Sequence, residues 1–337
     1  MKKQKLTSKQ IAAIAIEKET AYSKIDYSAL GAYEKCCYLL EHACGFHPTV
    51  GPNRHNQEMM EALIPELRKK YEGGEVNAGL FLSLALSRFT EKRDEARELL
   101  CKEVEAGNPY AALSYLRQVK PTKEDKRLAE KVMNFFSQSA DEKLLCIVNI
   151  LCAYVIGLFA EKEELEELNR LVSDSWEKLA LGGYFYAIDN VILHKKRALQ
   201  AAKGECPALQ EEYEAWVEAR FLILEHFYHA GYFHLGEKLA YHYYKGMGCA
   251  QDNTKAVDAL CRALLCRKAA LKPGTVILTD AKREELAQKG KLVAIDILDA
   301  LEKGEEALRA TVRKAVAEGY ISKACSAITV LRQAASA

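Results

Sequence analysis

Residues 243–256 constrain the fold of this 337-residue chain more than any other stretch. They read YYKGMGCAQDNTKA, in which Gly246 and Gly248 can supply the positive-φ backbone of a tight turn. Tyr243 is expected to end one helix before this turn, and Asp252 to cap the next helix with its carboxylate. The stretch therefore predicts two helices joined by a short turn, which is the unit of a stacked helical-repeat protein.

The spacing YxxGxGxxxDxxKA resembles the Sel1-like repeat, a relative of the tetratricopeptide repeat (TPR), and Leu239 falls where that family has a leucine. A second pattern of the family places small residues before a glycine and an alanine four residues after it. Gly107 with Ala111 and Gly183 with Ala187 match this pattern. Weaker matches in the same phase occur at residues 72–78, 230–231 and 315–324.

The phase of these matches predicts helix pairs at about 78 to 105, 109 to 138, 142 to 181, 184 to 230, 234 to 268 and 280 to 334, the last two irregular. The resemblance implies an all-α fold, an α-solenoid in which antiparallel helix hairpins form a right-handed superhelix, over residues 58–337. Residues 1–57 are expected to form an N-terminal helical cap with a turn-rich loop. Residues 272–280 are expected to be an extended connection rather than part of a sheet.

The charge balance excludes a global attraction to polyanions, because 48 basic residues are matched by 47 acidic ones. Eleven cysteines would suggest disulfides in a secreted chain, but the N-terminal sequence shows no signal peptide. We therefore expect a cytoplasmic protein with reduced thiols. The uncharged run 144–160 has the minimum length of a membrane span, yet a buried central helix explains its polar and small residues better.

Nothing in the sequence identifies a catalytic site or a cofactor site. No nucleophile elbow, phosphate loop or dinucleotide fingerprint occurs. We therefore predict a protein that is not an enzyme and that binds no cofactor.

Two clusters of residues could hold a metal ion. Half of the eight histidines fall within residues 226–242, but their spacing fits no zinc pattern, and side chains packed between helices or lining a groove are the preferred interpretation. The second cluster comprises Cys36, Cys37, Cys44, His47 and His55. Its intervals match no zinc module either, so structural cysteines are preferred and no metal is predicted.

The histidines alternate with aromatic residues, which favours a surface for protein contacts. The candidate partner-binding residues are Tyr232, Tyr241, Tyr244, His226, His229 and His234. Many such aromatic residues in helical repeats belong to the core instead, and Tyr243 is assigned there. The resemblance implies an adaptor or regulatory subunit that binds a helix, a peptide or an effector subunit, with no membrane partner.

Nucleic-acid binding is the alternative function, because helical repeats can also bind RNA. The basic runs at 68–70 and 195–197, together with Arg262, Arg267 and Lys268, could contact phosphates. Each run is short and has acidic neighbours, so a solvated helix face is the preferred interpretation.

Overall fold

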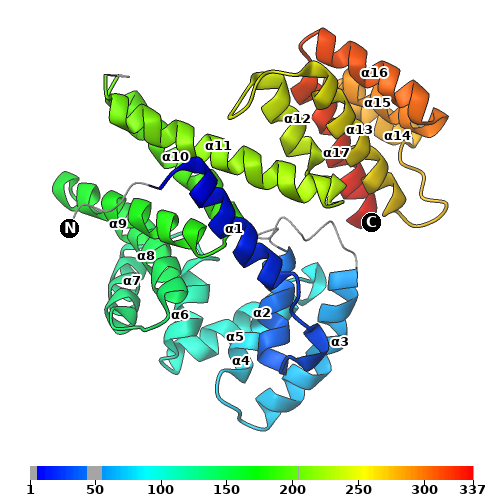
Figure 1. The fold of residues 1–337 in the computed structure, drawn as a ribbon. Helices are drawn as coiled ribbons and strands as arrows, with labels where there is room; N and C mark the ends of the chain where they lie inside the picture. Colours follow the sequence, from blue (N-terminus) through cyan, green and yellow to red (C-terminus); the bar gives the residue numbers. More distant parts are fainter. Residues whose placement is uncertain (1–5, 44–54, 204, 337) are drawn as a thin grey trace. The chain divides into compact units, whose positions relative to one another are not determined.

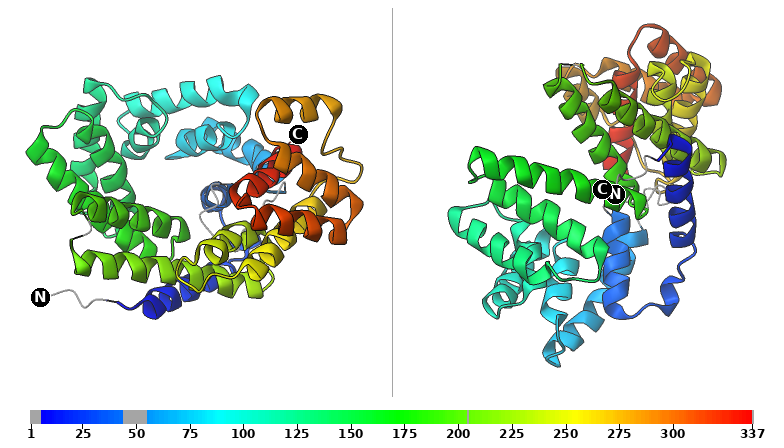
Figure 2. Two further views of the ribbon diagram at one scale, coloured as in Figure 1. Left: turned by 90° about the horizontal axis from the view of Figure 1, so that it is seen from above. Right: turned by 60° about the vertical axis from the view of Figure 1, so that its left-hand side comes forward.

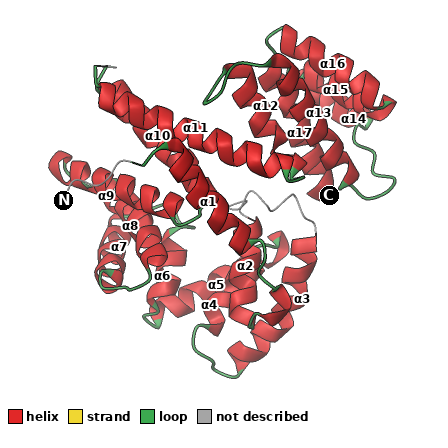
Figure 3. Cartoon of the chain, in the orientation of Figure 1, coloured by secondary structure: helices red, strands yellow, loops and turns green. Residues whose placement is uncertain are grey.

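The structure, a computed structural model, describes residues 6–43, 55–203 and 205–336. These residues form seventeen α-helices and three short 3-10 helices, with no strand among them (Figures 1 and 3). The all-α prediction is therefore confirmed. In the same ranges, none of the helices has both the length and the apolar character needed to cross a membrane.

The chain divides into two compact units, which we describe separately. The central unit comprises the described residues of Glu17–His47 and His55–His194, and the C-terminal unit comprises Lys195–Ala337 together with the described residues up to Ile16. The division falls inside α1 (Ser8–Tyr22) and α10 (Phe185–Ala201). Part of the turn-rich loop predicted before residue 57 lies outside the described residues.

The central unit is a succession of helices, most of which pack against their neighbours in the sequence (Figure 2, blue to green). After α1 and the 3-10 helix Tyr27–Ala29 come α2 (Ala32–Ala43), α3 (His55–Glu72), α4 (Ala78–Leu86), the 3-10 helix Thr90–Lys92, α5 (Arg93–Glu105), α6 (Pro109–Leu116), α7 (Lys123–Phe136), α8 (Glu142–Gly157) and α9 (Lys162–Leu181). Leu39, Leu67 and Leu82 join α2, α3 and α4 in one core, and Val132, Val148 and Cys152 join α7 and α8 in another.

The C-terminal unit contains α11 (Pro207–His229), the 3-10 helix Phe233–Leu235, α12 (Gly236–Lys245), α13 (Asn253–Ala269), α14 (Asp280–Gln288), α15 (Leu292–Lys303), α16 (Glu305–Ala317) and α17 (Ile321–Ser336). Its core includes Leu239, Leu260 and Ile297, all fully buried. Helix α13 packs against α12 and also against α16 and α17, which follow it by more than 35 residues.

Five of the predicted helix pairs, from 78 to 268, begin and end within two residues of the helices observed. The prediction of one pair at 280 to 334 is wrong, because this region contains the four helices α14 to α17. The additional breaks occur at Gly290, where φ is +67°, and at Gly304, where φ is +122°. Both glycines end a helix in a conformation that other residues rarely adopt.

The glycine turns predicted from the repeat pattern share one geometry. Gly107 and Gly183 have φ of +83° and +99°, and the residue after each glycine donates its amide to a carbonyl five residues earlier. The same bond closes three further predicted turns, at Gly74, Gly231 and Gly319, and it also occurs at Gly246 and Gly290. This arrangement satisfies carbonyls that a helix end leaves without a partner.

The turn at 246–252 also has its predicted geometry. Gly246 and Gly248 have φ of +65° and +73°. The side chain of Asp252 accepts a hydrogen bond of 2.9 Å from the Lys255 amide and so caps α13. Gly248 also lies against α11, since an added Cβ would approach the Cα atom of Glu218 to 2.7 Å. No larger residue fits this turn without a shift of backbone.

Helix α8 contains most of the uncharged run 144–160. Its buried face includes Cys152 and Val155, both fully buried, but Tyr154 is 62% exposed, and Leu158, directly after the helix, is 51% exposed. The prediction of a buried central helix is confirmed for one face only, because α8 packs mainly on α7 and α9 and its opposite face remains open. Residues 272–279 form a connection between α13 and α14 without a strand, as predicted.

Candidate functional site

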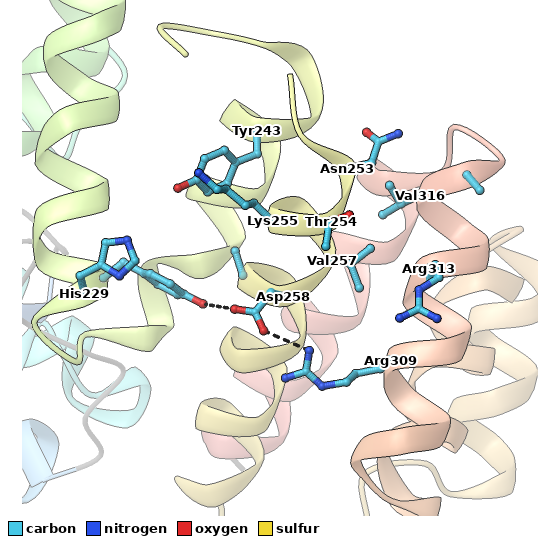
Figure 4. Close-up of a pocket in the computed structure, with 13 residues that line it drawn as sticks. His229, Tyr243, Asn253, Thr254, Lys255, Val257, Asp258, Arg309, Arg313 and Val316 are labelled. Carbon is cyan, nitrogen blue, oxygen red and sulfur yellow. Dashed lines mark hydrogen bonds and ion pairs between the residues drawn. The ribbon is translucent and has the colours of Figure 1, made fainter. Parts of the chain in front are cut away.

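A pocket of about 700 Å³ lies in the C-terminal unit between α11, α12, α13 and α16 (Figure 4). Its apolar and aromatic lining consists of Tyr228, Tyr243, Val257, Ala259, Val316 and Ala317. Its polar and charged lining consists of His229, Asn253, Thr254, Lys255, Asp258, Arg309 and Arg313. A volume of this size is within the range of pockets that bind small molecules, and it can also hold a few side chains of a larger ligand.

Local sequence places these residues around the pocket. Because the Asp252 cap starts α13 at Asn253, the first turns of α13 present Lys255 and Asp258 to the pocket. On α16, Arg309 and Arg313 are one helical turn apart and therefore lie on the same face. Two helices thus bring charged side chains to opposite sides of one cavity.

Asp258 is the centre of the polar contacts in the pocket. Its carboxylate accepts hydrogen bonds from the Tyr228 hydroxyl at 3.3 Å and from Arg309 Nη1 at 3.0 Å (Figure 4). Arg262 Nε lies 3.1 Å from the same carboxylate. Arg309 also donates to Glu305 at 2.9 Å, and the hydrogen bonds to Glu305 and Asp258 raise the pKa of Arg309. The charge of Arg309 is therefore compensated by two carboxylates.

Two other cations of the pocket have no such compensation. The amine of Lys255 lies over the Tyr243 ring, 5.3 Å from its centroid, and makes no ion pair with any residue that the structure describes. Arg313 is exposed, and within the same described residues its side chain makes neither a hydrogen bond nor an ion pair. In Figure 4 no interaction is drawn to Arg313.

Tyr243 borders the pocket and belongs to the core, as predicted. Its side chain is 5% exposed, and its hydroxyl donates to Glu225 at 2.7 Å. Burial, followed by the hydrogen bond to Glu225, raises the pKa of Tyr243. This residue is therefore a neutral donor that anchors α12 to α11.

The six predicted partner-binding residues do not all meet at the pocket. His229 lines it, whereas the other five are absent from its lining. Tyr241 is 39% exposed on α12, and Tyr244 is half-buried with its hydroxyl near the turn at Gly319. The remaining three are distributed around the end of α11, with His226 exposed and Tyr232 and His234 half-buried. Whether these residues bind a partner stays a prediction.

The histidine cluster contains one buried member, His242, which is 1% exposed. Its Nδ1 donates to the Met247 carbonyl at 2.7 Å, and its Nε2 contacts Arg220. This ring therefore closes the turn between α12 and α13. Across the described residues, no group of three histidine, cysteine or acidic side chains is arranged to hold a metal ion.

The other predicted cluster is described only in part. Cys36 is fully buried and Cys37 is exposed, so the two thiols point in different directions, as expected of neighbours on a helix. Cys44, His47 and the side chain of His55 lie outside the described residues.

Some of the basic residues considered for nucleic-acid binding are paired with acidic residues, whereas Lys69, Lys196 and Arg197 are exposed and make no ion pair with a described residue. Arg68 pairs with Glu95 at 2.6 Å, and Lys195 pairs with Glu212 at 2.8 Å. Lys70, Arg262 and Lys268 have carboxylate partners as well. Arg267 is 7% exposed, so it is not available to phosphates.

Sequence reasoning missed Arg309 and Arg313, the two cations that α16 contributes to the pocket. Their spacing was a usable signal, because residues four apart on a helix share a face. The partner of Arg309, Asp258, lies 51 residues earlier in the chain, so no local pattern connects the two.

Comparisons with models of protein families, with curated proteins and with solved structures give no match to this chain. The function is therefore inferred from the residues and the geometry described above.

Proposed function

We propose that both units are α-solenoids of antiparallel helix hairpins similar to Sel1-like and TPR repeats. The support is the turn geometry shared by five predicted glycine positions, together with the capped turn at 246–252. Such glycine turns end helices in many folds, so the support for a repeat is their recurrence at the predicted spacing. The right-handed superhelix is part of this proposal.

The chain acts in this proposal as a non-catalytic scaffold for protein-protein interaction, an adaptor or regulatory subunit in the cytoplasm. The observation that carries it is the pocket of about 700 Å³, which combines aromatic, apolar and cationic side chains from four helices. Exposed aromatic and arginine side chains around an apolar centre are typical of surfaces that bind polypeptides. Tyr241 is exposed on α12 outside the pocket lining, and it offers a separate contact for a partner.

A polypeptide partner is preferred over RNA because of the ion pairs. A protein that binds RNA through its backbone needs cations that are free to replace counterions. Here five of the nine basic residues considered are paired with carboxylates, which would have to be displaced first, and Arg267 is buried.

Affinity purification of the tagged full chain from its native cell, at low and at high salt, tests the proposal. A protein that is recovered in stoichiometric amount at both salt concentrations is the expected result. Nucleic acid that is recovered at low salt and lost at high salt would contradict the scaffold function and support RNA binding instead.

The purified complex also tests the predicted aromatic residues. Replacing Tyr241 and Tyr244 together by alanine should weaken partner binding about tenfold or more if these aromatic side chains contact the partner as predicted. Melting followed by circular dichroism should change little, because Tyr241 is 39% exposed and Tyr244 is only half-buried. Tyr243→Ala serves as the contrasting variant, and it should lower the melting temperature because its side chain is buried and bonded to Glu225. A large loss of stability in the double variant would assign Tyr241 and Tyr244 to the core.

A further inference from the structure

The charges of the pocket are unequally compensated, and this inequality indicates what the pocket binds. Arg309 is held by Asp258 and Glu305, at 3.0 and 2.9 Å. Lys255 and Arg313 have no acidic partner among the described residues. The pocket therefore has two cations that remain available to a ligand.

These two cations lie on different helices, with apolar surface between them. Lys255 belongs to α13 and Arg313 to α16 (Figure 4). Val257 and Val316 line the pocket between the two helices. A ligand that uses the whole site needs two separated acidic groups and an apolar part between them.

We infer that the pocket binds an acidic polypeptide segment in which carboxylate side chains alternate with apolar ones. This inference rests on the proposed function as a polypeptide-binding protein. A single phosphate would leave most of the volume of about 700 Å³ unfilled. A long polyanion such as RNA would require further free cations beside the pocket, but Arg262, the nearby cation on α13, is paired with Asp258 at 3.1 Å.

Asp258 limits the affinity of this site. It holds Arg309 at 3.0 Å and places a negative charge in a pocket that receives carboxylates. Removing the charge while keeping the shape, as in Asp258→Asn, would release Arg309 from one of its two partners and remove the repulsion. Its effect on affinity is therefore opposite to that of removing a cation.

Fluorescence anisotropy with the full chain tests the inference directly. The probe is a fluorescein-labelled peptide in which glutamate alternates with leucine and valine. The reference peptide has glutamine at each glutamate position, and a labelled oligouridylate of similar length represents RNA. The acidic peptide should bind about tenfold or more tightly than the glutamine peptide, since each charge-assisted contact contributes on the order of a tenfold change in the dissociation constant.

Variants of the neighbouring residues Arg313 and Lys314 distinguish binding in the pocket from a general attraction to surface charge. Arg313→Gln should weaken binding of the acidic peptide by about tenfold. Lys314→Gln makes the same change of charge at the next residue of α16, outside the pocket lining, and should leave affinity within about twofold. Asp258→Asn should strengthen binding. Circular dichroism melting shows whether each variant is folded, and the exposed Arg313 carries the test if Asp258→Asn is unstable.

The outcomes distinguish failure of the inference from failure of the proposed function. Equal affinity for the glutamine and glutamate peptides would overturn the acidic preference of the pocket. If Ala317→Trp, which blocks the pocket, then abolished the binding of both peptides, the pocket would still be a polypeptide site. Equal weakening by Arg313→Gln and Lys314→Gln would overturn the assignment to the pocket. Tighter binding of oligouridylate than of either peptide would contradict both the inference and the scaffold function.

Discussion

The two units of the chain use the same turns but pack their helices differently. In the central unit, α4 to α9 pack chiefly on the helices next to them in the sequence. In the C-terminal unit, α13 packs on α12 but also on α16 and α17, and α12 packs on α17. The difference does not come from the turns, because Gly107 and Gly183 in one unit have the same geometry as Gly319 in the other.

This comparison separates two determinants of the structure. A glycine turn fixes the two helices that it joins, because its backbone bonds are local. Which helices then pack together depends on side chains distant in the sequence. The candidate pocket arises from the second determinant, since α16 reaches α13 over a separation of 51 residues between Arg309 and Asp258.

The largest predicted effect concerns the turn that positions the pocket. Gly248→Ala should destabilise the C-terminal unit by about 3 kcal/mol, because a positive φ costs roughly 1 kcal/mol for alanine and forced overpacking costs roughly 2 more. Here the new Cβ would lie 2.7 Å from the Cα atom of Glu218. Urea unfolding is followed by the fluorescence of Trp216, on α11 of the C-terminal unit, in a Trp176→Phe background.

Gly274→Ala is the matched control for this prediction. Gly274 also has a positive φ, +82°, but nothing lies within 4 Å of an added Cβ. Gly274→Ala should therefore lower the free energy of unfolding by only about 1 kcal/mol. Equal effects of the two variants would show that the close approach of the 246–252 turn to α11 does not stabilise the unit.

An intermediate effect is predicted for Asn108, which follows the Gly107 turn of the central unit. Its side chain caps α6 and also donates to Asn77 at 3.0 Å and to Glu103 at 2.9 Å. Asn108→Ala should lower the free energy of unfolding of the central unit by about 1 to 2 kcal/mol. The measurement is urea unfolding followed by Trp176, on α9 of the same unit, in a Trp216→Phe background.

The control for Asn108 is Asn134→Ala on α7, where the side chain is exposed and makes no hydrogen bond to a described residue. This variant should be neutral or slightly stabilising, because alanine favours the helix. If Asn108→Ala instead altered only the unfolding reported by Trp216, the assignment of the turn to the central unit would be wrong.

The smallest effect is on the reactivity of one buried thiol in each unit. Burial raises the pKa of Cys152 in the central unit and of Cys261 in the C-terminal unit to about 12. Because the thiolate is the reactive form and a raised pKa depletes it, both should be alkylated slowly by iodoacetamide at pH 8. Mass spectrometry should show rates at least about tenfold below that of the half-buried Cys206, and faster alkylation of either residue would reveal local opening of its unit.

The sequence was sufficient to predict the helices, because the features that define them are local. Asp252 and the glycine turns act within a few residues of their own positions, so five helix pairs were placed correctly. The prediction for the region after residue 280 was wrong because the breaks at Gly290 and Gly304 lie outside the repeat pattern.

The pocket was not predicted, because its residues come together only through tertiary packing. Tyr243 and His229 were singled out, the first for the core and the second for a binding surface. Arg309 and Arg313 were not, since their role depends on α16 packing against α13. Charge pairing such as that of Lys195 with Glu212 is likewise visible only in the structure.

The most direct measurement of the central claim is site-specific cross-linking from the pocket in the native cell. A photoreactive benzophenone amino acid replaces Ala317, which is exposed at the pocket, and Lys314 is the control position on the same helix. The account predicts a cross-link from residue 317, but not from 314, to a protein segment that alternates acidic and apolar residues. A cross-link to nucleic acid, or the same products from both positions, would contradict it.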